Sequence, residues 1–178
     1  LSLKGRHWKW RMYGGAVSLA HQYEALKLEP DLILATDMLN LATFLGLTRA
    51  GLSRIPVAVY FHENQITYPW SPTDQDVQLG RDNQYGFINY TTALAADAVF
   101  FNSPFHRQSF LEHLPAFLRQ FPDARELQNV ERIKAKSKVL PLGMVLRPLQ
   151  AQRTKEYSGP ATILWNHRWE NDKNPDGF

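Results

Sequence analysis

Four short apolar segments alternate with longer segments of helical periodicity, and this alternation leaves few folds open to the chain. The apolar segments span residues 31–36, 57–61, 98–103 and 138–143. Each is a continuous apolar run, as is typical of strands that are covered on both faces. Strands of this kind separated by helices predict an α/β fold, in which helices flank a parallel sheet.

The segments between the strands set the expected helices. Apolar residues at helical spacing predict five of them, over residues 16–29, 37–48, 82–97, 104–121 and 124–136. Thr36 or Asp37 is expected to cap the second helix. Pro115 is expected to kink or break the fourth. Prolines and a glycine between residues 66 and 81 predict a loop there.

The second strand ends in an unusual polar group, within the stretch VYFHENQITYP (residues 59–69). His62, Glu63, Asn64 and Gln65 follow the apolar run directly. They could be a loop start that happens to be polar, or a binding edge. Parallel sheets bind ligands at the carboxyl ends of their strands, and Asn102 ends the third strand in the same way, which favours a binding edge.

Composition excludes several classes of site. The 178 residues include no cysteine, which excludes disulfides and cysteine-based zinc sites and fits a reducing compartment. No apolar run is long enough to cross a membrane, so no membrane contact is expected. His62 and Glu63 are neighbours on a strand and should point to opposite faces, so no metal site is expected there. Dinucleotide-binding, P-loop and GxSxG patterns do not occur.

Positive charge gathers in two places. Residues 1–23 contain Lys4, Arg6, Lys9 and Arg11 and no acid, and Trp8 and Trp10 lie among them. A second cluster is Arg132, Lys134, Lys136 and Lys138. Such mixtures can bind phosphates and stack on bases, or they can be an ordinary solvated face with buried tryptophans.

Two further polar groups allow two interpretations each. Arg168 and Lys173 follow an apolar segment (residues 161–167) that is expected to be a strand leading into a helix. They could hold a diphosphate or lie on a surface loop. Asp82 and Gln84 open a predicted helix, where they could cap it or face the same cleft as His62.

Several of these stretches together resemble one family. The blocks YFHENQITYP, RDNQYGF, ADAVFFNSPFHRQSFL, FPD and NHRWENDKNPDGF occur in this order. They are similar to the signature blocks of the tRNA-queuosine alpha-mannosyltransferases, and the resemblance extends from HWKWRM to the last residue. It implies a GT-B fold and a retaining transfer of mannose from GDP-mannose to queuosine in the tRNA anticodon. It implies no cofactor and no metal, and a cytoplasmic protein.

The resemblance also implies an organisation into domains. Residues 1–146 would form a Rossmann-like acceptor-side domain, whose first strand would precede residue 1. Residues 147–160 would be a linker, and residues 161–178 the truncated start of the donor-binding domain. The chain is therefore expected to be a fragment that is inactive alone.

Roles for individual residues follow from the same resemblance. His62 would approach the donor sugar, while Arg168 and Lys173 would hold the donor diphosphate. Gly143 would close the N-terminal domain. The cleft would be lined by Glu63, Asn64, Asp82, Gln84 and Asn102. Arg6, Trp8, Lys9, Trp10 and Arg11 would contact tRNA, together with the second basic cluster.

Two alternatives remain open on the sequence alone. One is a nucleic-acid-binding α/β module without catalysis, for which the basic N-terminal segment would suffice. The other is a glycosyltransferase of the same fold with a different acceptor. A parent sequence that continues well beyond Phe178 with another α/β pattern would favour an enzyme. The sequence does not predict the oligomeric state.

Overall fold

A four-stranded parallel sheet organises the chain. The computed structural model describes residues 1–150, 159–160 and 162–177. The strands are β1 (Ile33–Thr36), β2 (Val57–Phe61), β3 (Ala98–Phe101) and β4 (Ser137–Val139). They are parallel and lie in the order β1-β2-β3-β4. The predicted α/β fold with a parallel sheet flanked by helices is confirmed.

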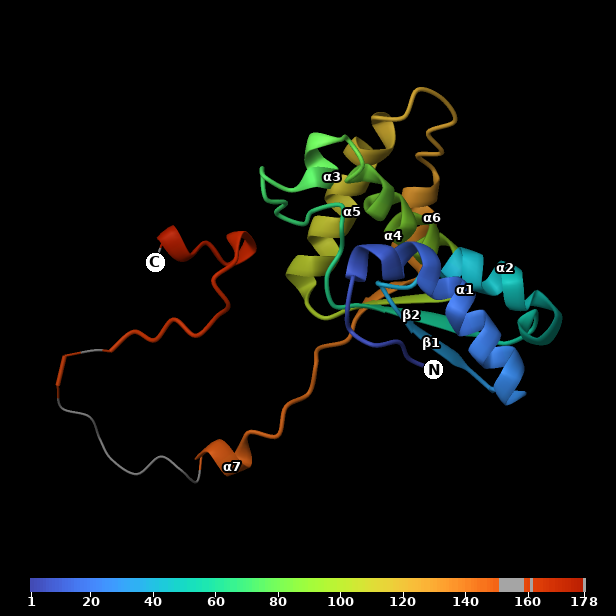
Figure 1. Cartoon of the computed structure of the whole chain (residues 1–178), viewed down its shortest axis with the longest axis horizontal. Coiled ribbons are helices and arrows are strands. Elements are labelled where there is room, and N and C mark those ends of the chain that lie inside the picture. The colour runs from blue at the N-terminus through green and yellow to red at the C-terminus, as the bar shows by residue number, and fades with distance from the viewer. Residues whose placement is uncertain (151–158, 161, 178) are drawn as a thin grey trace.

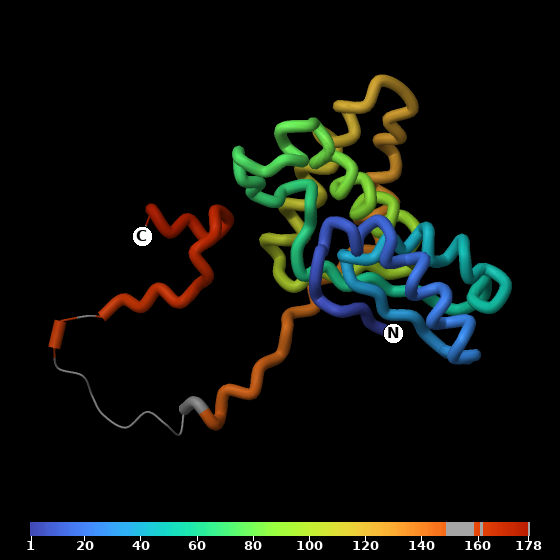
Figure 2. The backbone as a smooth tube through the Cα atoms, in the orientation of Figure 1, coloured from blue at the N-terminus to red at the C-terminus, as the bar shows by residue number. Residues whose placement is uncertain are grey.

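Helices connect and cover these strands (Figure 1). The longer ones are α1 (Trp8–Leu26), α2 (Leu41–Leu52), α4 (Asn83–Ala95), α5 (Pro104–Arg119) and α6 (Asn129–Ala135). Two short helices are α3 (Gln75–Gln78), within the long loop after β2, and α7 (Arg147–Gln150). Helix α1 packs along α2, and α2 packs against α4. The backbone trace in Figure 2 leaves this body after β4.

Aromatic and β-branched side chains of the two central strands form the core. Val59, Phe61, Val99 and Phe101 are fully buried, and the rings of Phe61 and Phe101 stack with centroids 5.2 Å apart. β2 is buried at four of its five positions, as expected for a central parallel strand. The carboxyl end of β2 is therefore fixed by packing on both sides.

β1 differs from the prediction, because it is an edge strand and is not covered on both faces. Its only described neighbour is β2, and the side chain of Leu34 is 66% exposed. A continuous apolar run does not by itself distinguish an edge strand from a central one.

α1 begins eight residues earlier than predicted. It runs through Gly14 and Gly15, each of which costs about 1 kcal/mol in a helix relative to alanine. Tertiary packing outweighs this cost, since Met12 is fully buried in a small cluster with Tyr85 and Ile88. Gly14 also lies under the Trp10 ring, where a Cβ atom would come within 2.9 Å of a ring carbon.

Other details also differ from the predictions, and α6 begins at Asn129, five residues later than predicted. Asn40, and not Thr36 or Asp37, caps α2, and its side chain accepts a hydrogen bond from Thr43 N at 3.1 Å. α5 continues through Pro115, since residues on both sides of it are buried in the core. β4 ends at Val139 because β3, its partner, ends at Phe101.

The C-terminal segment shows no predicted strand over residues 162–167 and no long helix after it. Residues 162–177 contain only two 3-10 turns, Asn171–Lys173 and Pro175–Gly177. A strand needs a neighbour to satisfy its backbone groups, and Ile163 and Leu164 are 78% and 81% exposed here. Most of the predicted linker (147–160) lies outside the described residues.

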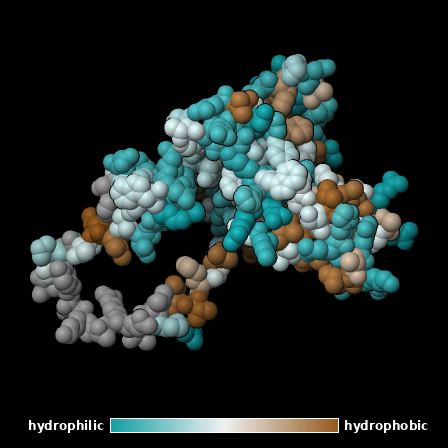
Figure 3. All heavy atoms as spheres, viewed as in Figure 1, coloured by the Kyte–Doolittle hydropathy of each residue, from teal (hydrophilic) through white to brown (hydrophobic). Residues whose placement is uncertain are grey.

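Apolar side chains are exposed on the segment that leaves β4. Leu142, Met144 and Val145 are each at least 75% exposed, and Figure 3 shows hydrophobic atoms on this segment. Among the described residues, no helix is long and apolar enough to span a bilayer.

Candidate active site

The carboxyl ends of β2 and β3 meet at a polar cavity. Asn102 Nδ2 donates a hydrogen bond of 2.9 Å to the carbonyl oxygen of His62. The cavity has a volume of about 280 Å³, and its lining includes His62, Glu63, Asn64, Tyr68, Asn102 and His106. The prediction that His62 and Asn102 lie at one edge of the sheet is confirmed.

His62 is paired with a buried carboxylate. Its ring Nδ1 contacts Asp37 Oδ1, and the same oxygen accepts a hydrogen bond of 3.2 Å from His62 N. The Asp37 side chain is 1% exposed, whereas that of His62 is 48% exposed. Because Asp37 occupies Nδ1, Nε2 is the ring atom left for a ligand in the cavity. The hydrogen bond with Asp37 raises the pKa of His62 above its usual range.

One buried asparagine of α4 fixes the two loops that carry this pair. Asn89 Nδ2 donates to the carbonyl oxygen of Asp37 at 2.9 Å, and Asn89 Oδ1 accepts from Gln65 N at 2.6 Å. Asn89 is fully buried. The positions of Asp37 and His62 relative to each other are therefore set from within the core.

The polar group after β2 divides into two halves with different tasks. His62 and Glu63 line the cavity, and His62 is half-exposed while Glu63 is partly buried. Asn64 and Gln65 are buried, and Asn64 Oδ1 accepts hydrogen bonds from Ile66 N and Thr67 N at 3.1 and 3.0 Å. Asn64 lines the cavity, but its polar atoms build the turn. The turn interpretation therefore holds for Asn64, while a binding edge at His62 and Glu63 stays a prediction.

Two further ionisable groups lie in the cavity. Burial, followed by the nearby charge of Asp37, raises the pKa of Glu63. His106 Nδ1 lies 3.0 Å from Asn102 Oδ1, and burial lowers the pKa of His106. Since Asn102 Nδ2 donates to His62, its Oδ1 is the acceptor, and His106 carries its proton on Nδ1. Asp37, Asn89 and His106 were not predicted from the sequence.

Arg168 and Lys173 have acidic neighbours in their own segment. Arg168 Nη1 lies 3.1 Å from Glu170 Oε1, and Lys173 Nζ lies 2.6 Å from Asp172 Oδ2. Burial raises the pKa of Glu63 and the pKa of Tyr68, and the charge of Lys173 opposes both increases. Arg168 is 75% exposed.

The sequence is similar to known proteins over most of its length. Residues 1–144 match the N-terminal domain of tRNA-queuosine alpha-mannosyltransferases. The chain belongs to this family. It is 35% identical, over 188 aligned positions, to the tRNA-queuosine alpha-mannosyltransferase of Drosophila melanogaster. That alignment covers 98% of the chain and 46% of the relative, so the chain spans about half the length of this curated mannosyltransferase.

In this mannosyltransferase-family chain, the predicted cleft residues Asp82 and Gln84, and the predicted domain-closing Gly143, do not line the cavity of His62. Asp82 lines a different pocket, with Gln65, Trp70 and Phe117. Gln84 Oε1 accepts a hydrogen bond from the Tyr13 hydroxyl. Gly143 is exposed beyond β4, with no atom near enough to contact a Cβ there.

Two of the residues that were predicted to contact tRNA, Lys9 and Trp8, pack against the long loop after β2 in this family member. Lys9 Nζ lies 2.6 Å from Asp74 Oδ1 and 2.7 Å from Asp76 Oδ2, and 5.3 Å from the centroid of the Trp70 ring. Trp8 is partly buried in the same cluster. Lys9 thus joins α1 to the long loop. Its charge already has two carboxylate partners.

The other residues that were predicted to contact tRNA differ in exposure and in their partners. Trp10 is 66% exposed, Arg6 is exposed and Arg11 is partly buried. In the second cluster, Lys136 Nζ donates to the carbonyl oxygens of Leu94 and Ala96 at the end of α4. This contact gives Lys136 a structural task, while Lys138 is exposed. No group of three metal-ligating side chains occurs among the described residues.

Replacing Lys9 with alanine is expected to reduce stability. Asp74 and Asp76 would face each other without their shared cation, which we expect to cost roughly 1 kcal/mol. The measurement is the free energy of unfolding from urea titration. Lys9→Met keeps the stem over the Trp70 ring and should lose only the charge effect. A loss of stability in Lys9→Met that persists in 1 M salt would contradict the electrostatic origin.

The His62–Asp37 pair also predicts a pH dependence. The pKa of His62 is raised in the folded state, so the stabilisation is fully present below the unfolded value, about 6.5. It is lost as the pH rises through the higher folded value. The melting temperature of the chain should exceed that of a His62→Gln variant most at pH 5.5 and least at pH 8.5. An unchanged difference would contradict the charged pair.

Proposed function

We propose that the chain is the acceptor-side half of a retaining GT-B glycosyltransferase, which transfers mannose from GDP-mannose to queuosine in the tRNA anticodon. The observation that carries this proposal is the alignment of nearly the whole chain with a mannosyltransferase of that name. The polar cavity at the carboxyl ends of β2 and β3 supports it, because α/β sheets bind their ligands at this edge.

The chemistry to be assisted is the departure of a diphosphate from the anomeric carbon of the donor sugar. Negative charge grows on the leaving phosphate, and Arg168 and Lys173 would stabilise it. Each would exchange its present carboxylate neighbour, Glu170 or Asp172, for the diphosphate. The leaving phosphate itself can accept the proton of the acceptor hydroxyl, so a pair of catalytic carboxylates is not needed.

His62 would act on the sugar. With Nδ1 held by Asp37, Nε2 can hydrogen-bond a sugar hydroxyl or the charge that develops in the transition state. Glu63 and Asn102 line the same cavity and would contact the sugar or the acceptor. Asn64 would serve through the turn that it builds.

The acceptor would approach over the basic N-terminal segment. Arg6 and Trp10 are exposed there and can contact phosphate and base. Because tRNA is the acceptor in this proposal, we expect a cytoplasmic enzyme. No metal and no cofactor are part of the proposed reaction.

The test is mannose transfer by a full-length protein that contains this chain. It is incubated with GDP-mannose and with tRNA that either carries or lacks queuosine. Transfer only to the queuosine-containing tRNA is expected, and the chain alone should be inactive. Equal transfer to both tRNAs would favour a different acceptor. Binding of tRNA without transfer from any sugar nucleotide would favour a non-catalytic binding module.

A further inference from the structure

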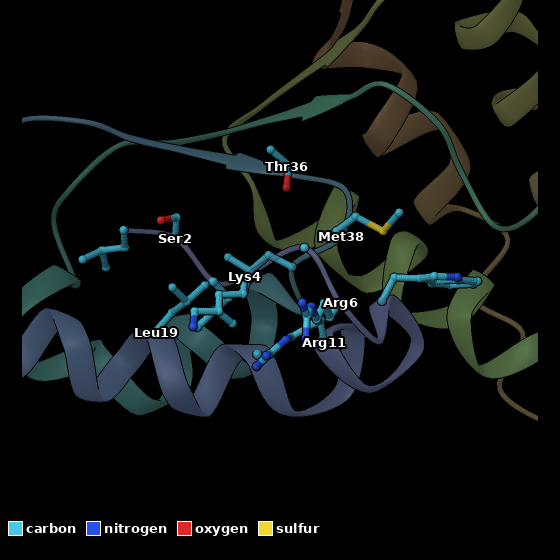
Figure 4. Close-up of a pocket in the computed structure, with 13 residues that line it drawn as sticks. Ser2, Lys4, Arg6, Arg11, Leu19, Thr36 and Met38 are labelled. Atoms are coloured by element: carbon cyan, nitrogen blue, oxygen red, sulfur yellow. The ribbon is translucent and has the colours of Figure 1, made fainter. Parts of the chain in front are cut away.

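A second cavity, of about 410 Å³, opens between the N-terminal segment and α1 (Figure 4). Thirteen residues line it, including Lys4, Arg6, Arg11, Thr36 and Met38. In the view of Figure 4, the side chains of Lys4, Arg6 and Arg11 project over α1. Thr36 and Met38 lie across from them, at the end of β1.

The charges of this cavity are unbalanced. None of the thirteen lining residues is acidic. Lys4, Arg6 and Arg11 form no ion pair with any residue that the structure describes. Lys9, on the same helix, has two carboxylate partners. Clustered like charges repel one another, and an anion between them would relieve that repulsion.

The side chain of Arg11 independently indicates that an anion occupies this cavity. Its Nε atom is buried and has no hydrogen-bond partner in the described part of the chain. A buried donor without a partner destabilises the fold, so such groups usually have an explanation, for example an ion that occupies the site. A guanidinium group has several donors in a planar fork, which matches the oxygens of a phosphate.

We infer that this cavity binds a phosphate group through Arg6 and Arg11. Lys4 adds charge and the Thr36 hydroxyl adds a donor at the opposite wall. Thr36 and Met38 flank Asp37, which contacts His62, so the bound phosphate lies beside the candidate active site. The bound phosphate group belongs either to a phosphodiester of the RNA backbone or to a small nucleotide. The first source rests on the proposed tRNA acceptor.

The test is a binding measurement that needs no turnover. The ¹⁵N-labelled chain is titrated with inorganic phosphate, with GDP and with a short single-stranded RNA, and the Arg11 Nε–Hε resonance is followed by NMR. Variants that lack Arg11 are compared with the unchanged chain through the backbone amide resonances of residues 4–11. We expect this resonance to shift and saturate. Arg6→Ala/Arg11→Ala should weaken binding at least about tenfold, since each charged hydrogen bond contributes about 1.5–3 kcal/mol.

The matched control is Arg49→Ala/Arg54→Ala, which removes the same charge from exposed positions outside the cavity. It should bind nearly as the unchanged chain does. Arg6→Lys/Arg11→Lys keeps the charge but loses the planar fork, and should bind with intermediate affinity. Thermal melts show whether each variant is folded, and the lysine variant serves if the alanine variant is not.

The outcomes separate the sources and the alternatives. RNA binding much tighter than that of phosphate and GDP supports the backbone phosphodiester. Binding of phosphate or GDP with no effect of RNA supports a small ligand. The inference is overturned if the Arg11 resonance moves with none of the three probes, or if the control pair weakens binding as much as the cavity pair. Failure of mannose transfer would leave these results unaffected.

Discussion

Replacing His62 with alanine in a full-length enzyme is expected to lower kcat for mannose transfer by about 10²–10³ with the fold intact. This is the usual loss when a single contact that is made chiefly in the transition state is removed. His62 is suited to such a contact because Asp37 holds Nδ1 and leaves Nε2 for the cavity. The measurement is the steady-state rate with GDP-mannose and queuosine-containing tRNA.

The matched control is His21→Ala, which removes an exposed histidine of α1 that lines none of the cavities described above. It should transfer mannose at nearly the unchanged rate. A folded His62→Ala variant with near-normal kcat would mean that His62 only begins a loop. A variant that no longer melts cooperatively would mean that His62 is chiefly structural.

Replacing Asp37 with alanine is the second large effect that we expect, on stability as well as rate. The His62 N–H and ring would both lose their acceptor, at a cost of about 1–3 kcal/mol. That corresponds to a melting temperature lower by about 2–12 °C for a chain of this size. The rate should fall about tenfold, since Asp37 positions His62 and does not touch the substrate.

Asp37→Asn distinguishes positioning from folding. The asparagine oxygen can still accept from His62 N, so most of the stability should return, while the ring loses its carboxylate. The pKa of His62, followed by NMR of the ring, should fall toward its ordinary value, because Asp37 is the main cause of its increase. An unchanged pKa of His62 in this variant would contradict the pairing.

The sheet could be predicted because its signals are local. Strands such as 57–61 are continuous apolar runs, and the residues between them repeat at helical spacing. The errors arose where tertiary contacts decide. Burial of Met12 begins α1 early in spite of Gly14, and the end of β3 stops β4. Leu34 is as apolar as its neighbours, although it lies on an exposed edge strand.

Part of the candidate site could be predicted from the topology of the sheet. Its residues at strand ends, His62 and Asn102, follow from topology. Asp37 also follows a strand directly, and that signal was present, but an aspartate before a helix is more often a cap. Asn89 lies within a helix and contacts two distant loops, so no pattern in the sequence marks it.

We expect Asp37 and His62 to act as one unit in the proposed mannose transfer. A double-mutant cycle of kcat/KM on the unchanged enzyme, Asp37→Asn, His62→Ala and the double variant tests this coupling. Asp37→Asn should slow the unchanged enzyme about tenfold and have almost no further effect once His62 is alanine. If Asp37→Asn slows both enzymes by the same factor, Asp37 does not act through His62 and the claim is wrong.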